Sequence, residues 1–300
     1  KESSAASDVY KRQPYNPLMK IFFLGPEGTN SDLAARNIFK DNAKFVPLPS
    51  IEDIFEKVAM SHSYYGVIPF ENSYQGVINS SLNCLIDYDL KILREFNFSV
   101  SHHLCSANAE FDLHKIKKIT SHPQVFGQCN NWIRNNLPDV EKVVATSTAE
   151  AASKAVHDNE FFCIANSYAI ELFNLHTHLE NIQDSNDNKT RFLVIGKSIE
   201  EKADQNKTSV MINIADKPGS LMSILQPFTE LNINMTRIET RPSRNNDYLH
   251  TFFIDFEGYY EDEIIIKLLE KLEKMSEELR IIGSYSVLNL SLIHISEPTR

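Results

Sequence analysis

Four short polar segments carry side chains that can bind an anion or donate a hydrogen bond to a small molecule. Each stands at the edge of an apolar run; they are Gly25–Thr29 (GPEGT), Glu71–Ser73 (ENS), Ser121–Gln128 (SHPQVFGQ) and Asn188–Phe192 (NKTRF). In the last, Thr190 offers a hydroxyl donor, and Arg191 offers a planar fork that suits a carboxylate. In the first, glycines at a strand-to-helix turn let backbone N–H groups approach an anion. No Gly-Lys-Ser/Thr follows that turn, which excludes a Walker loop.

Each segment also has a purely structural explanation. Asn72 or Ser73 could cap a helix, and Ser121 could cap the helix that follows it. Gln128 lies one turn further on, where it faces either a ligand or solvent. Arg191 could brace a loop instead of binding a carboxylate. Taken one at a time, the segments therefore do not decide the function.

Strand and helix patterns alternate between residues 20 and 196, and these elements must position the polar segments. The apolar runs expected to form strands are 20–25, 45–48, 65–70, 116–120, 140–145 and 161–165. A helix is expected after Ser50, with Asp53 at the capping-box position, and another over Val77–Leu85. This order predicts mostly parallel sheets in two lobes, linked near Leu90–Cys105, with a ligand cleft between them.

A second arrangement of elements begins after Lys197. Residues 198–207 are polar and indicate a linker. The elements expected beyond it are a strand at 208–215, a helix through 231, strands at 233–240 and 248–256 around the turn-rich SRNND, a helix at 261–275 and a strand at 280–288. The order βαββαβ is that of a ferredoxin-like domain.

Composition limits the partners of the chain. Its 300 residues, 42% of them hydrophobic, suffice for two domains with real cores. The net charge of −10 argues against a nucleic-acid surface, which has to be basic. No apolar run is long enough to span a bilayer, and no secretory pattern is present, so a soluble, cytoplasmic protein is expected.

Cysteine and histidine usage argues against a metal site. Cys84, Cys105, Cys129 and Cys163 are widely spaced and form no CxxC pair, which indicates reduced thiols rather than disulfides or a zinc site. The histidines His102, His103 and His122 lack a spaced set of carboxylates or cysteines, so they are interpreted as surface or structural residues.

In combination, the motifs resemble one family. The order GPEGT, IPFENS, SHPQ with Gln128, STAEAA and IQD…NKTRF is similar to that of the prephenate dehydratases along residues 20–196. The segments KPGSL (217–221) and IETRP (238–242) resemble those of an ACT regulatory domain. The resemblance implies an α/β fold: a two-lobed, periplasmic-binding-protein-like catalytic domain followed by a ferredoxin-like (βαββαβ) ACT domain.

The domain boundaries follow from this resemblance and from the polar linker. The catalytic domain is expected at 19–197, the linker at 198–206 and the ACT domain at 207–290. Residues 1–18 are expected to be a non-native or disordered leader, and 291–300 a non-native tail.

The implied reaction converts prephenate to phenylpyruvate with loss of water and carbon dioxide. Aromatisation drives it, so the resemblance implies no metal, nucleotide or redox cofactor. Thr190 is implied to donate a hydrogen bond to the departing oxygen. The residues implied to take part in catalysis are Thr190, Arg191, Glu71, Asn72, Ser121 and Gln128; those implied to bind substrate are Thr29, Asn72, Ser73, Ser121, Thr190 and Arg191.

The same resemblance implies feedback by phenylalanine. The residues implied to bind it are Pro218, Gly219, Ser220, Leu221, Asn234, Glu239 and Thr240. Because ACT domains bind the effector in pairs, a homodimer or homotetramer is expected. Two motifs depart from the family pattern: Asn30 and Asp32 stand where GTFSH has an aromatic residue and a histidine, and Thr240 replaces the serine of ESRP.

Three alternatives remain open at the level of sequence. An arogenate dehydratase would use the same chemistry on the aminated substrate, and no residue here decides between the two. A non-catalytic, two-lobed ligand-binding protein would have the same cleft. A fused chorismate mutase is not expected, because only about twenty residues precede the first strand.

Overall fold

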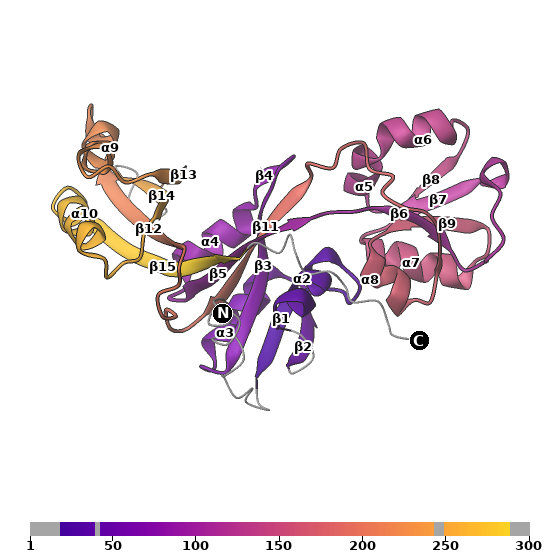
Figure 1. The fold of residues 1–300 in the computed structure, drawn as a ribbon, viewed down its shortest axis with the longest axis horizontal. Coiled ribbons are helices and arrows are strands. Elements are labelled where there is room, and N and C mark those ends of the chain that lie inside the picture. Colours follow the sequence, from indigo (N-terminus) through magenta and orange to yellow (C-terminus); the bar gives the residue numbers. More distant parts are fainter. Residues whose placement is uncertain (1–18, 40–42, 243–248, 289–300) are drawn as a thin grey trace, which may run out of the picture.

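The structure is a computed structural model that describes residues 19–39, 43–242 and 249–288 (Figure 1). The predicted leader, the predicted tail and the SRNND turn lie outside the described residues. Within the described residues the strands form two sheets, one of ten strands and one of five. The larger sheet runs through the first lobe and the C-terminal module, and the smaller sheet belongs to the second lobe (Figure 1).

The first lobe contributes six strands to the larger sheet and three helices that pack on it. They are β1 (Lys20–Leu24), α2 (Asn30–Phe39), β2 (Lys44–Leu48), α3 (Ile51–Ala59), β3 (Tyr64–Asn72), β4 (Gly76–Val77), α4 (Asn79–Asp87), β5 (Lys91–Ser99) and β11 (Lys189–Gly196). The predicted capping box is present, since Ser50 accepts a hydrogen bond from the Asp53 N–H. The helix predicted over Val77–Leu85 begins later, because Val77 pairs with β3.

The second lobe is built on the five-stranded sheet. Its elements are β6 (His103–Ser106), the 3₁₀ turn η3 (Leu113–Lys115), β7 (Lys118–Ser121), α5 (Pro123–Gln128), α6 (Asn130–Asn136), β8 (Glu141–Val144), α7 (Thr148–His157), β9 (Phe161–Ala165), α8 (Ser167–Leu172) and β10 (His176–Leu179). Strands β8, β7 and β9 are parallel, while β6 and β10 are antiparallel additions.

One prediction about the lobes is wrong. The sheets are mixed rather than mostly parallel, because β11 runs antiparallel to both β3 and β5. The link expected near Leu90–Cys105 consists mainly of strands β5 and β6. β5 is a central strand because its side chains feed two cores: Ile92 belongs to one, and Leu93 and Phe96 belong to the other.

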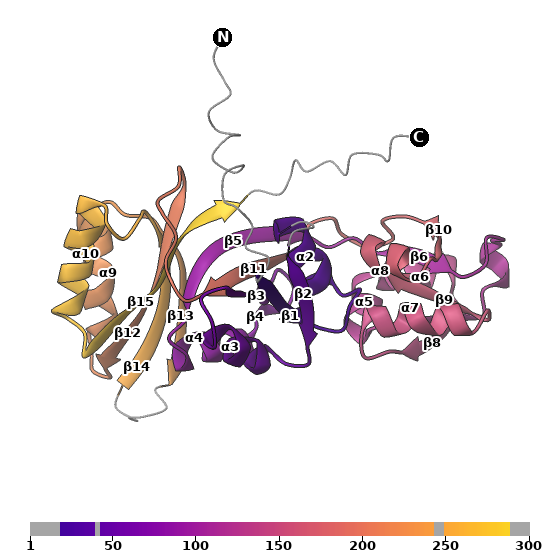
Figure 2. The same cartoon turned by 90° about the horizontal axis from the view of Figure 1, so that it is seen from below.

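The C-terminal module has the predicted ferredoxin-like order. Its elements are β12 (Asn206–Ala215), α9 (Ser220–Glu230), β13 (Met235–Pro242), β14 (Leu249–Glu257), α10 (Glu263–Glu273) and β15 (Glu278–Leu288). The strand order β13-β14-β12-β15 continues into β5 of the first lobe. Helices α9 and α10 cover the side of this sheet that faces away from the first lobe (Figure 2).

The module and the first lobe also share a core. One buried cluster joins Phe55 and Ile68 of the lobe to Met211, Phe253 and Tyr285 of the module. The sheets join through parallel pairing of β15 with β5, where a Cβ at Gly283 would lie 2.4 Å from the Ile92 carbonyl oxygen. Only glycine permits this approach of the two backbones. The described part of the chain contains no helix long and apolar enough to cross a membrane.

Candidate active site

Thr190 and Asn72 face each other on the antiparallel strands β11 and β3. The Asn72 Nδ2 donates hydrogen bonds to Thr190 Oγ1 and to Asn188 Oδ1, both at 3.0 Å, and the Tyr74 N–H donates to Asn72 Oδ1 at 3.0 Å. All three polar side chains of this group are buried. Because Asn72 uses both its donors and its acceptor, its amide has one orientation. Thr190 accepts from Asn72, which leaves its own proton to be donated to a ligand.

Asn188 completes this group and was not among the residues chosen from the sequence. Its Nδ2 is buried and has no hydrogen-bond partner in the described part of the chain. A buried donor without a partner is costly, and a bound ligand can satisfy it. Asn188 opens the NKTRF segment, but sequence alone did not separate it from ordinary loop residues.

Ser73 braces the loop beside this group. Its Oγ donates to the Asp187 carbonyl at 3.2 Å and accepts from the Lys189 N–H at 3.1 Å. Neither Ser73 nor Asn72 caps a helix, since α4 begins at Asn79 after Ile78. Both residues therefore contact the NKTRF segment instead of capping a helix.

Glu71 and Arg191 are the next register pair, and their side chains contact the C-terminal module. Glu71 forms an ion pair with Arg237 of β13. The Arg191 Nη2 lies 2.5 Å from Glu95 Oε2 and 2.7 Å from Asp255 Oδ2. Both predicted ligand groups are thus occupied by protein partners. For Arg191, this geometry favours a structural role within the protein over binding of a substrate carboxylate. The Glu71 carboxylate points towards a cation of the protein.

The first predicted segment forms a tight turn. Thr29 Oγ1 donates to the Leu24 carbonyl at 3.1 Å and accepts from the Asp32 N–H at 3.4 Å. The buried Asp32 carboxylate accepts from the Gly28 N–H at 2.9 Å and pairs with Arg36. Asp32, where the family pattern has a histidine, therefore holds the turn together.

This turn contacts the second lobe directly. Asn166, the N-cap of α8, donates to the Gly28 carbonyl at 3.1 Å and to Asn30 Oδ1 at 2.9 Å. A Cβ at Gly28 would lie 3.3 Å from that of Ala149 in the STAEAA segment. The structure thus brings together two motifs that are far apart in sequence. Asn166 was missed because an N-cap asparagine carries no further signal in the sequence.

Ser121 and Gln128 lie in the second lobe. Ser121 is buried and donates to the Ile164 carbonyl at 2.7 Å. It does not cap α5 as its structural explanation predicted, because His122 is the N-cap. Gln128 Oε1 lies 2.6 Å from His102 Nε2. Burial lowers the pKa of His102, so the ring is neutral near pH 7 and donates this bond from Nε2. Its Nδ1 is then an acceptor, and it is buried without a partner among the described residues.

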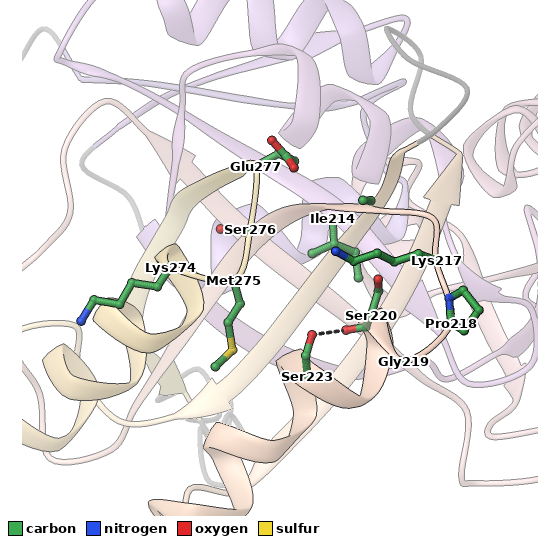
Figure 3. Close-up of a pocket in the computed structure, with 11 residues that line it drawn as sticks. Ile214, Lys217, Pro218, Gly219, Ser220, Ser223, Lys274, Met275, Ser276 and Glu277 are labelled. Atoms are coloured by element: carbon green, nitrogen blue, oxygen red, sulfur yellow. Dashed lines mark hydrogen bonds between the residues drawn. The ribbon is translucent and has the colours of Figure 1, made fainter.

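A separate pocket of about 520 Å³ lies in the C-terminal module (Figure 3). Pro218, Gly219 and Ser220 line it at the start of α9, and Lys274 and Glu277 line it from the opposite side. Lys217 is the third ionic residue of the lining, and in Figure 3 its side chain extends across the pocket, whereas that of Lys274 extends away from it.

The other predicted effector residues lie elsewhere. Leu221 is not part of the lining and is exposed. Asn234 donates to Glu257 Oε1 at 2.9 Å, Glu239 Oε1 lies 3.2 Å from Arg237 Nη1, and Thr240 is exposed on β13. Of the seven predicted effector residues, the pocket lining therefore includes only Pro218, Gly219 and Ser220. Across the described ranges, no group of histidine, cysteine and carboxylate side chains could hold a metal ion.

The fold and the site together define a class: a two-lobed α/β protein with buried polar ligand groups near the join of its lobes and a ferredoxin-like module on the first lobe. Comparison with known proteins narrows this class. The family model described as prephenate dehydratase matches residues 21–200. This chain belongs to the prephenate dehydratase family and is an enzyme of that family, which confirms the lyase predicted from the motifs.

Individual relatives agree. The chain is 36% identical to a bifunctional chorismate mutase/prephenate dehydratase of Aquifex aeolicus, covering 89% of this chain and 73% of that protein. It is 35% identical to a prephenate dehydratase of Methanocaldococcus jannaschii, covering 89% and 98%. The crystal structure of a prephenate dehydratase from Arthrobacter aurescens in complex with L-Phe matches with a TM-score of 0.82 at 28% identity, covering 89% and 90%.

Proposed function

We propose that Thr190, Asn72 and Asn188 form the centre at which prephenate loses its ring hydroxyl and carbon dioxide. The observation that carries this proposal is the Thr190 hydroxyl, oriented by Asn72 at 3.0 Å with its own proton free. As the ring C–O bond breaks, the oxygen gains negative charge, and a fixed donor stabilises that charge. The electron pair of the bond between the ring and its carboxylate enters the ring, and carbon dioxide leaves. The ring hydroxyl departs with the electron pair of its C–O bond and takes a proton from solvent to become water.

Electrostatics near this centre suit a dianionic substrate. The Glu71 carboxylate faces Arg237, and the Asp32 carboxylate faces Arg36, so both charges are compensated by the protein. Arg191 is enclosed by its own partners, which leaves neutral donors such as the Asn188 amide for the substrate carboxylates. Both substrates carry two carboxylates, but prephenate has a ketone where arogenate has an ammonium group. We favour prephenate because neutral donors can donate to the ketone, whereas the ammonium group would need an acceptor.

Thr29, Ser73, Ser121 and Gln128 have supporting roles in this proposal. Thr29 shapes the turn that meets the second lobe, and Ser73 holds the NKTRF segment. Gln128 fixes His102 on the segment that crosses between the lobes. Ser121 holds β7 to β9 through the Ile164 carbonyl.

The C-terminal module is proposed to be an ACT domain that senses phenylalanine. The catalytic domain would then span 19–197, the linker 198–206 and the module 207–290, although β12 already begins at Asn206. Ionic residues of both signs, Lys217 and Glu277 among them, line the pocket beside Gly219, and the relative from Arthrobacter aurescens was solved with L-Phe. Pairing of two modules would make the enzyme a homodimer or homotetramer. Four buried, unbridged cysteines support a reducing compartment, the cytoplasm.

The test measures phenylpyruvate formation from prephenate by absorbance, with and without phenylalanine. Turnover of arogenate, whose product is phenylalanine itself, is measured separately by amino-acid analysis. We expect turnover of prephenate that phenylalanine suppresses. Faster turnover of arogenate would replace the proposed substrate. Turnover that phenylalanine leaves unchanged would contradict the effector role of the module while leaving the catalytic assignment intact.

A further inference from the structure

A buried network of charges joins the catalytic strands to the C-terminal module. We call it the interface network. Its members are Arg191, Glu71 and Glu95 from the first lobe and Arg237 and Asp255 from the module. Arg191 and Asp255 form its centre: their side chains are only 8% and 1% exposed, and Nη2 and Oδ2 are 2.7 Å apart. Arg237 forms the second connection, from β13 to Glu71 on β3.

The two arginines of the interface network pack on the same aromatic ring. The Arg191 and Arg237 guanidinium carbons lie 5.0 and 5.4 Å from the centroid of the Phe70 ring. Phe70 in turn packs on Phe253 of the module, with ring centroids 5.6 Å apart. Cation–π contacts of this kind are stronger when water is excluded.

Further polar side chains of the module hold the network in place. Lys207 Nζ lies 2.8 Å from Glu95 Oε1, and Arg191 Nη2 donates to the Tyr285 hydroxyl at 3.1 Å. Ser209 donates to Asp255 Oδ1 at 2.5 Å. Burial by itself would lower the pKa of Arg191, but Asp255, Tyr285 and Glu95 raise it, so the guanidinium stays charged.

The interface network includes the residues that are adjacent in sequence to Asn72 and Thr190. Glu71 and Asn72 are neighbours on β3, and Thr190 and Arg191 are neighbours on β11. Side chains alternate between the two faces of a strand, so one register pair supplies the polar centre while the next is held by the module. The register between β3 and β11 shifts directly after Arg191, which leaves Phe70 unpaired in a bulge. A bulge of this kind re-aims neighbouring side chains.

We propose that Arg237 and Asp255 are positioning residues for the reaction, acting through Glu71 and Arg191 on the Asn72–Thr190 pair. This inference rests on the proposed placement of the chemistry at Thr190. It makes the module part of the machinery that fixes the active site, in addition to any effector that the module binds. Removal of Arg237 would leave the half-buried Glu71 without its cation, and removal of Asp255 would leave Arg191 with Glu95 as its remaining carboxylate partner. The strands would shift to relieve either imbalance.

The first experiment is steady-state kinetics of Arg237→Gln, Glu71→Gln and the double variant. We expect Arg237→Gln to lower kcat about tenfold with KM changed less than about threefold, and Arg237→Lys to recover part of the loss. Because Arg237 acts through Glu71, the double variant should be no slower than the slower single variant. The matched control is Lys271→Gln, which removes the exposed ion pair with Glu230 on the outer helices of the module.

Two results would overturn the inference. One is a kcat for Arg237→Gln within twofold of the parent enzyme. The other is a double variant whose loss is the product of the two single losses, which would mean that Arg237 and Glu71 act independently. A different result would overturn the proposed function itself: if Thr190→Val turns over prephenate as fast as the parent enzyme, the chemistry does not take place at Thr190. In that case a slower Arg237→Gln would not be evidence for positioning of the Asn72–Thr190 pair.

A second measurement does not depend on turnover. Amide hydrogen exchange, followed by mass spectrometry, should be faster in the peptides that cover 70–74 and 188–192 in Arg237→Gln and in Asp255→Asn. The Lys271→Gln control should leave both peptides at the rates of the parent enzyme. Unchanged exchange in Arg237→Gln would show that the module does not hold these strands, whatever the activity.

Discussion

The Asn72 amide donates a 3.0 Å hydrogen bond to the Thr190 hydroxyl across two antiparallel strands, although the two residues are 118 positions apart in the sequence. This bond determines which way the hydroxyl can donate. It also means that a change at either residue affects the other, so activity and local stability are linked at this pair.

Replacement of Thr190 by valine should remove the donor while keeping the shape of the side chain. We expect kcat to fall by about two to three orders of magnitude, as for loss of a transition-state donor. Far-UV circular dichroism should match that of the parent enzyme. Thr177→Val, at an exposed position of β10, is the control and should be fully active. Undiminished turnover in Thr190→Val would remove Thr190 from the mechanism.

Replacement of Asn188 by aspartate tests the unpartnered amide. The variant keeps an acceptor for Asn72 but exchanges the free donor for a negative charge. We expect KM for prephenate to rise about tenfold or more, because like charges brought together cost several kcal/mol. The control is Asn186→Asp, at an exposed position two residues earlier. Equal KM values for the two variants would mean that Asn188 does not meet the substrate.

Replacement of Gly219 by valine tests the effector pocket. Gly219 is the N-cap of α9 with a φ of 90°, a conformation that a β-branched residue adopts only with strain. We expect basal turnover to persist while inhibition by phenylalanine weakens. Gly219→Asn should retain more of the inhibition, because asparagine tolerates positive φ. The comparison is a dose–response curve for phenylalanine; identical curves for parent and valine variants would exclude this loop from effector binding.

Acid should destabilise the second lobe before its carboxylates titrate. Burial lowers the pKa of His102, His103 and His178, so the unfolded chain binds protons more readily than the folded chain. Stability contributed by the neutral rings is therefore complete above their unfolded pKa of about 6.5 and is lost as pH falls below it. We expect the urea midpoint to drop between pH 7 and pH 5, and to drop less in His102→Asn. An unchanged drop in that variant, matching the exposed control His114→Asn, would contradict this account.

The sequence predicted the fold class well where local patterns decide it. Ser50 and Asp53 predict the start of a helix, and the structure contains that helix. The βαββαβ order after Lys197 follows from the spacing of apolar residues, which differs between strands and helices. It did not reveal β5 as a central strand, because its apolar residues serve two different cores and its neighbours β11 and β15 are distant in sequence.

The site was predicted in its parts but not in its connections. Thr190 and Asn72 were chosen, and their direct hydrogen bond became visible only from the strand register. The partners of Arg191 could not be predicted from the residues next to it in the sequence. Asp255 and Tyr285 belong to the C-terminal module, which the sequence motifs indicate to be a separate domain. From the sequence alone, the Arg191 guanidinium is equally suited to a carboxylate of the substrate and to a carboxylate of the protein.

The pairing of β15 with β5 has a consequence for how the enzyme can be divided. Because the last strand of the module lies between β12 and β5, its backbone hydrogen bonds serve both parts at once, and Gly283 allows no side chain between them. A chain shortened before β15 would lose more than a separate domain, because it would expose an unpaired edge on β5 and uncover Ile92. The first lobe and the C-terminal module thus share one sheet and one core, and we expect them to unfold together and not to be exchangeable between enzymes as independent domains.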